Sequence, residues 1–194
     1  MAIPFIKFTD DKGFEVTEEA VEFLQSLNSN KLGIVSIVGK YRTGKSYFVN
    51  KVLLQSEKNK GFKVGPTINP CTKGIWIWKK VLHVKTDEEE NLDVIILDTE
   101  GFGGIDEDAN HDTRIFLFSI LLSSFFIYNS LGAINENALN SLALIVNLAK
   151  DIKIKKDGSQ SEEDVKKNFP SFLWVIRDFM LSLETQTGNK LTSK

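Results

Sequence analysis

Apolar residues along this chain fall into short runs and spaced stripes that predict alternating strands and helices. Short apolar runs of strand length cover 32–38, 92–97, 125–128 and 172–176. Apolar residues at helical spacing predict helices over 17–27, 47–54, 113–122 and 136–152. An alternation of buried strands with helices is typical of an α/β fold, in which helices cover the faces of a mainly parallel sheet.

Two further segments are expected to add strands, the first as an extended or hairpin segment and the second as an antiparallel hairpin. Residues 5–15 alternate around a polar turn, and Thr17 then has the side chain and position of a helix N-cap. Only an acidic turn at 87–91 separates the aromatic-rich stretch 73–85 from the strand at 92–97. Polar or glycine-rich loops are expected at 55–72, 102–112 and 153–168.

A phosphate-binding pattern directly follows the first long apolar run. Eight residues fit G-x-x-x-x-G-K-[ST], and these are Gly39, Lys40, Tyr41, Arg42, Thr43, Gly44, Lys45 and Ser46. A helical pattern starts at Tyr47, so the loop joins a strand to a helix, as this motif requires. Lys45 would reach the β- and γ-phosphates of a nucleotide, and the Ser46 hydroxyl would bind Mg²⁺. The sequence therefore predicts a P-loop NTPase with three αβα layers and a mixed, mostly parallel sheet.

Composition narrows the function classes without identifying one. A net charge of −2 and a pI of about 5.8 show no general basic character, so nucleic acid is not an expected partner. Cys71 is the single cysteine, which excludes an intrachain disulfide and favours a reducing, cytoplasmic location. The two histidines, His83 and His111, lie far apart in sequence, which disfavours a zinc site. The apolar stretch 115–128 contains three serines and is too short to span a bilayer, so no membrane segment is expected.

Two features downstream of the loop suit a nucleoside triphosphate. Asp98-Thr99-Glu100-Gly101 is a D-x-x-G pattern at the end of a strand, where a carboxylate can hold Mg²⁺ through water and a backbone amide can contact the γ-phosphate. Thr72 ends the loop at 55–72, and its hydroxyl could join Ser46 on Mg²⁺. Taken singly, the Asp98 pattern is equally explained by an ordinary turn, and Thr72 is better explained as an ordinary threonine at a strand entry.

The base-recognition signal is weaker than the phosphate signal. The pattern usual in GTPases, Asn-Lys-x-Asp, is absent, because Asn30-Lys31 and Asn189-Lys190 lack the aspartate. Arg177-Asp178 instead follows the last apolar run, and a carboxylate there could accept two N–H donors from a guanine edge.

With these motifs the sequence resembles the large GTPases of the guanylate-binding protein and atlastin group, within the dynamin superfamily. The residues of the phosphate loop and of the TKGIW motif resemble guanylate-binding proteins more than atlastins. The resemblance covers roughly 5–184, and its motifs are VGKYRTGKSYFVNK, TKGIWIW, LDTEGFG, LLSSFFIYNSLGAIN and FPSFLWVIRDF.

This resemblance implies a GTPase that binds GTP or GDP with Mg²⁺, hydrolyses GTP and forms a homodimer across the nucleotide face. Arg42 would be an internal arginine finger that dimerisation turns toward the phosphates. Glu100 would act through water, and Asp112 would lie in a loop that relays to the attacking water. The implied catalytic residues are Arg42, Lys45, Thr72 and Glu100. The implied Mg²⁺ ligands are Ser46, Thr72 and Asp98. The implied nucleotide contacts are Gly39, Lys40, Tyr41, Arg42, Thr43, Gly44, Lys45, Ser46, Tyr47, Thr72, Asp98, Gly101, Arg177 and Asp178.

Two departures from the family pattern keep other functions open. Pro70 stands where family members often carry a serine, which predicts slow hydrolysis, and only sixteen residues follow Asp178. Residues 1–194 are therefore expected to be one GTPase domain that is truncated at its C-terminal end. One alternative is a catalytically weak nucleotide-binding scaffold, and another is a P-loop ATPase or nucleoside kinase.

Overall fold

The computed structural model describes most of the chain and places it in helices and strands. The described residues are 1–9, 11–57, 60–64, 73–87, 90–103, 109–134, 136–154, 169–180, Glu184 and Lys190. The strands are β1 (Ala2–Thr9), β2 (Gly13–Val16), β3 (Leu32–Gly39), β4 (Ile75–Trp78), β5 (Leu82–Lys85), β6 (Asn91–Thr99), β7 (Phe125–Leu131) and β8 (Ser171–Arg177). The helices are α1 (Glu18–Gln25), α2 (Lys45–Phe48), the π-helical segment η1 (Val49–Leu53), α3 (Ala109–Leu122) and α4 (Glu136–Ile154).

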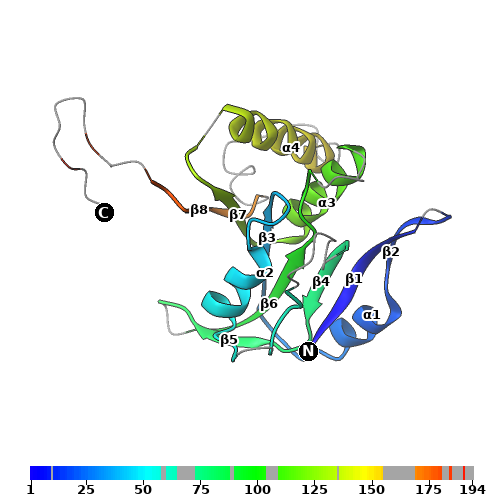
Figure 1. Cartoon of the computed structure of the whole chain (residues 1–194). Coiled ribbons are helices and arrows are strands. Elements are labelled where there is room, and N and C mark those ends of the chain that lie inside the picture. Colours follow the sequence, from blue (N-terminus) through cyan, green and yellow to red (C-terminus); the bar gives the residue numbers. More distant parts are fainter. Residues whose placement is uncertain are drawn as a thin grey trace.

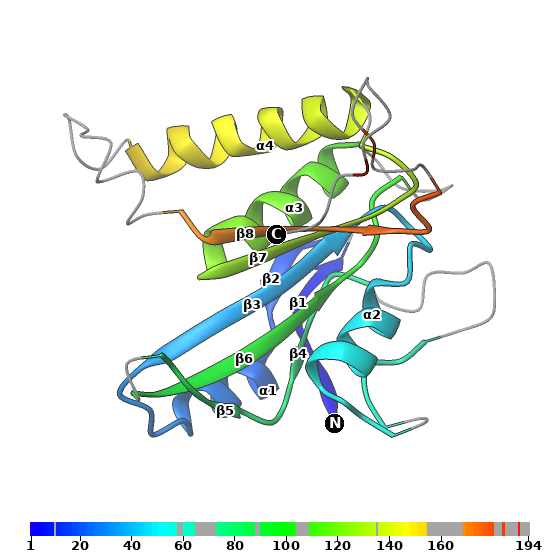
Figure 2. The same ribbon diagram turned by 90° about the vertical axis from the view of Figure 1, so that its left-hand side faces the viewer.

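One mixed sheet joins the strands in the order β2-β1-β4-β6-β3-β7-β8, with β5 also paired to β6. Strands β6, β3, β7 and β8 are parallel to one another, whereas β1, β2, β4 and β5 pair antiparallel. The parallel strands alternate with helices along the chain, as crossover connections require, and the antiparallel ones include tight hairpins. The carboxyl ends of the parallel strands consequently meet at one edge of the sheet (Figure 2).

Helices cover both faces of this sheet, which confirms the three-layer α/β prediction. On β6, Ile95 and Leu97 point to the face covered by α1 and α3, and the helix α4 extends the same layer beside α3. The alternating residues Val94 and Ile96 point to the other face, where Val49 of η1 packs. The views in Figures 1 and 2 agree, since α3 and α4 lie on one side of the sheet and α2 on the other. A strand buried on both faces needs apolar residues at successive positions, and this is why β6 reads as a continuous apolar run.

Most predicted elements are confirmed, including the two hairpins and the cap of the first helix. Thr17 is the N-cap of α1, and its Oγ1 accepts a hydrogen bond from the amide of Ala20 at 3.3 Å. The prediction of a loop through 102–112 is wrong at its end, because α3 already begins at Ala109. None of the described helices is long and apolar enough to cross a membrane.

Candidate functional site

The glycine loop lies at the carboxyl end of β3 and runs into α2 (Figure 1). Gly39 ends the strand, and a Cβ there would lie 2.0 Å from the carbonyl oxygen of Asn129 on β7. Gly44 has a φ of +78°, and a Cβ there would lie 2.2 Å from Nη1 of Arg177. Because one glycine lies against a neighbouring strand and the other has a left-handed backbone, the motif's glycine positions follow from this packing.

Side chains from the two neighbouring strands fasten the loop. The Asn129 side-chain amide on β7 donates to the carbonyl oxygen of Thr43 at 3.0 Å, and Asn129 is fully buried. Nη1 of Arg177, at the end of β8, donates to the carbonyl oxygens of Thr43 and Gly44 at 3.1 and 3.2 Å. In a trans peptide the C=O and N–H bonds point in opposite directions. Because these carbonyl oxygens face β7 and β8, the N–H groups of the same peptides point away from those strands.

Lys45 is buried inside the loop, where a cation is costly without a partner. Its side chain is 6% exposed, and Nζ donates to the carbonyl oxygen of Lys40 at 3.1 Å. Burial lowers the pKa of Lys45 to about 8, and the carboxylates of Asp98, Glu100 and Asp112 oppose this fall. A polyanion bound beside Nζ would add negative charge and further offset the cost of burial.

Asp98 and Ser46 meet beside this lysine. Parallel pairing sets Asp98 of β6 opposite Ile37 of β3, and the Ser46 hydroxyl donates to the Asp98 carboxylate. A hydroxyl and a carboxylate are hard oxygen ligands that suit Mg²⁺, which usually keeps several waters and takes its other ligands from substrate phosphates. The described residues contain no group of three or more His, Cys, Asp and Glu side chains that would form an all-protein metal cage.

Glu100 is held on both of its carboxylate oxygens. It is 4% exposed; Oε2 accepts from the amide of Gly74 at 2.8 Å, and Oε1 is hydrogen-bonded to Nε2 of His111 on α3. The next residue, Gly101, lies so close to the loop that a Cβ would be 2.4 Å from Cα of Tyr41. The segment after β6 is therefore packed directly on the glycine loop.

Asp112, expected in a mobile loop, lies in the first turn of α3. Its Oδ2 accepts from the amide of Gly103 at 2.7 Å, and its Oδ1 is buried with no hydrogen-bond partner among the described residues. Asp112 lines a small hollow together with Glu100 and Phe102. This arrangement brings Asp112 near the other carboxylates at the loop.

The remaining predicted contacts lie further toward the surface. Arg42 is exposed at a left-handed φ of +59°, with Cζ 5.9 Å from the ring centroid of Tyr41. Tyr47 is half-exposed and lies 5.8 Å from Cζ of Arg177. Asp178 follows β8, is exposed, and also has a positive φ of +53°. Thr72 and Pro70 lie outside the described residues.

A family model described as "Guanylate-binding protein, N-terminal domain" matches residues 11–194. The chain belongs to the guanylate-binding protein family.

Individual relatives in the guanylate-binding protein family agree with this assignment. The chain is 39% identical to human guanylate-binding protein 1 over 186 residues and 41% identical to human guanylate-binding protein 3 over 179 residues, each time over 90% of this chain. It is 40% identical to mouse guanylate-binding protein 2 over 183 residues, or 92% of this chain. The chain spans only 29%, 29% and 30% of these three relatives.

Two residues of the guanylate-binding protein site escaped sequence reasoning. His111 was considered only as a zinc ligand, yet it contacts the buried Glu100. Asn129 ends an apolar run and was not considered, although a buried amide in a core strand is a signal that it bonds something specific. Arg177 is predicted as a nucleotide contact, and in the structure its guanidinium bonds to carbonyl oxygens of the phosphate loop.

Proposed function

We propose that this guanylate-binding protein domain binds GTP with Mg²⁺ at the glycine loop and hydrolyses it. The observation that carries the proposal is the buried Lys45 ammonium, whose Nζ lies within the loop and is bonded to the carbonyl of Lys40. An ammonium in this position is costly for the empty protein, and a triphosphate would offset the cost. The family, whose name refers to guanylate binding, supports GTP as that triphosphate.

Mg²⁺ would be held by Ser46 and by Asp98 through water, with Thr72 as a third ligand from the family resemblance. When bound, the ion would neutralise charge on the phosphate oxygens. The residues of this chain would do the rest: loop amides bind the phosphates, Lys45 reaches their outer oxygens, and Gly101 contributes an amide at the γ-phosphate end.

Guanine selectivity is assigned to Asp178. A carboxylate accepts two N–H donors from guanine, and adenine does not present them in that arrangement. Arg177 supports this role indirectly, because its bonds to Thr43 and Gly44 connect the end of β8 to the phosphate loop.

Arg42 is proposed as the arginine finger, acting when two copies of the domain associate across the nucleotide face. Its exposed position on the loop and the family resemblance support this role, because a guanidinium near the γ-phosphate stabilises charge in the transition state. Homodimerisation is part of the same proposal.

A nucleotide-binding scaffold without hydrolysis is the second candidate. The observation that favours it is Glu100, whose two carboxylate oxygens are already bonded to Gly74 and His111. Two of the roughly four acceptor sites of this carboxylate are therefore used within the protein, which leaves fewer for an attacking water.

Calorimetry and phosphate release separate these candidates. Non-hydrolysable GTP and ATP analogues are titrated into the chain with and without Mg²⁺, and phosphate release from GTP is measured over a range of protein concentrations. We expect tight Mg²⁺-dependent binding of the GTP analogue and a specific rate that rises with protein concentration. Binding without phosphate release at any concentration would support the scaffold, and no binding would refute both candidates.

A further inference from the structure

His111 connects a distant part of the fold to the proposed catalytic carboxylate. It lies in the first turn of α3, its side chain is 13% exposed, and its Nε2 is bonded to Oε1 of Glu100. An ionised carboxylate only accepts hydrogen bonds, so Nε2 carries the hydrogen in this pair. With the amide of Gly74 on Oε2, the carboxylate has a partner on each oxygen.

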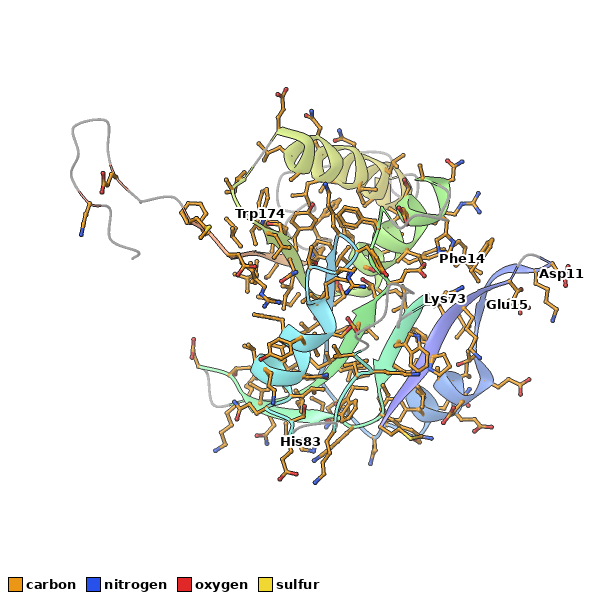
Figure 3. All side chains as sticks on the ribbon, in the orientation of Figure 1. Asp11, Phe14, Glu15, Lys73, His83 and Trp174 are labelled. Atoms are coloured by element: carbon orange, nitrogen blue, oxygen red, sulfur yellow. The ribbon has the colours of Figure 1, made fainter. Side chains whose placement is uncertain are left out.

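The imidazole ring is itself clamped between aromatic side chains of the β1–β2 hairpin. Phe14 of β2 stacks on it with a centroid distance of 5.1 Å and an interplanar angle of 22°. Phe8 of β1 meets it edge-on at 4.9 Å and 78°. Phe118 of α3 in turn meets the Phe14 ring edge-on, with a centroid distance of 5.2 Å. Figure 3 shows Phe14 between the hairpin and α3. Such packing fixes the ring plane, and with it the direction of the Nε2–H bond.

The Glu100 carboxylate in turn joins two segments that flank the phosphate loop. The amide of Glu100 donates to the carbonyl oxygen of Gly74 at 2.9 Å, while its Oε2 accepts from the amide of the same glycine. Gly74 directly precedes β4, and Glu100 directly follows β6. The orientation of this one carboxylate thus depends on a short chain of contacts from the hairpin through His111.

We propose that His111 is a positioning residue for Glu100, which orients the carboxylate for GTP hydrolysis through the Nε2–H bond. The inference rests on the proposed function, since it concerns the rate of the same reaction. Without the Nε2–H donor, the Oε1 atom loses its partner in a buried site and the carboxylate can rotate about its last torsion. We expect the turnover rate to depend on this bond and nucleotide affinity to be independent of it.

Two substitutions separate the hydrogen bond from the packing. His111→Phe keeps an aromatic ring against Phe8 and Phe14 but removes the N–H donor, and His111→Gln supplies an amide N–H of similar reach. We expect kcat for GTP to fall about tenfold in the Phe variant, the scale of one hydrogen bond to a charged group, with KM unchanged. We expect the Gln variant to recover most of the loss. His83→Phe is the matched control, because His83 is exposed on β5 and bonded to Asp93.

A rate in His111→Phe equal to wild type, or an equal loss in the Phe and Gln variants, would overturn the inference while leaving the GTPase proposal intact. Wild-type chain that releases no phosphate would instead overturn the proposed hydrolysis, and with it the claim that His111 sets its rate. Nucleotide-affinity measurements on the same variants check that the effect lies in turnover.

Nuclear magnetic resonance of the imidazoles gives a readout that needs no turnover. The chain has only two histidines, so the side-chain ¹H–¹⁵N spectrum has two imidazole systems to assign. Figure 3 shows His83 at the far side of the molecule from Phe14. We expect Glu100→Gln to shift the His111 nitrogens and leave His83 unchanged, and Asp93→Asn to do the reverse. No change at His111 in Glu100→Gln would show that the pair does not exist in solution and would overturn the inference.

Discussion

The two sides of the phosphate loop are built in different ways. On the side of β6 and α3, Lys45 and Glu100 are buried and Ser46 is half-buried, and each has a bonded partner: Lys45 on Lys40, Ser46 on Asp98, and Glu100 on His111. On the side of β8, Tyr47 and Asp178 are exposed, and Arg177 contacts the loop. We call these the phosphate side and the base side.

The difference shows how a single loop can combine phosphate binding by rigidly held residues with selection of the base by exposed ones. Residues on the phosphate side are oriented by the core itself, because β6 is central in the sheet and buried on both faces. The base side lies at the end of β8, which is the last of the described strands in the sheet order and pairs with β7. Substitutions on the phosphate side should therefore affect every nucleoside triphosphate, and those on the base side should change the choice between nucleotides.

The largest effect is expected for Arg42→Ala, which removes an exposed side chain of the phosphate loop that is proposed to act on the γ-phosphate. Removing an arginine finger should lower single-turnover GTP hydrolysis by about 10³-fold while analogue affinity is kept. Rapid-quench measurement of phosphate release checks this, with the exposed Arg114→Ala on α3 as the control. An unchanged rate would remove the arginine finger from the proposal.

Lys45→Ala should abolish tight binding of GTP and ATP alike. The affinity loss should approach 10³-fold, about the cost of removing one partner from a buried charged contact. Calorimetry with both analogues checks it, and Lys51→Ala, further along the same helical stretch and exposed, is the control. Retained affinity would mean that the loop does not bind phosphates.

Asp178→Asn should act on the base alone. Its amide presents one donor where guanine needs an acceptor, so GTP affinity should fall about 100-fold, and ATP affinity should not fall. Competition binding with the two analogues measures the ratio, and Asp87→Asn in an exposed turn is the control. Equal losses for GTP and ATP would show that the base and phosphate sides are not separable.

Arg177→Met gives the smallest effect and tests the link between the two sides. The Met side chain fills similar space but leaves the carbonyls of Thr43 and Gly44 without this donor. Affinity for both nucleotides should fall about tenfold, as expected for hydrogen bonds that involve a charged group. A loss confined to GTP would instead place Arg177 in base recognition beside Asp178.

Individual residues show which features of the structure can be predicted from the sequence and which cannot. The strand at 32–38 and the glycine loop after it were found because an apolar run and fixed glycine spacings are local signals. The start of α3 was misjudged because its first turn is polar, and acidic and polar residues are common at a helix N-terminus as well as in loops. The pairing of Ser46 with Asp98 was foreseen only as a shared metal site, since nothing in a sequence reports the distance between residues that are 52 positions apart.

The sequence by itself determined the α/β class, the glycine loop and the candidate residues at the ends of the buried strands, because each depends on residues that are neighbours along the chain. Only the tertiary structure decided that Asn129 and Arg177 contact the same loop carbonyl, and that His111 orients toward Glu100. These contacts depend on the register between parallel strands and on the angle at which α3 crosses the sheet. Both are set by packing of the whole core, which no local pattern encodes.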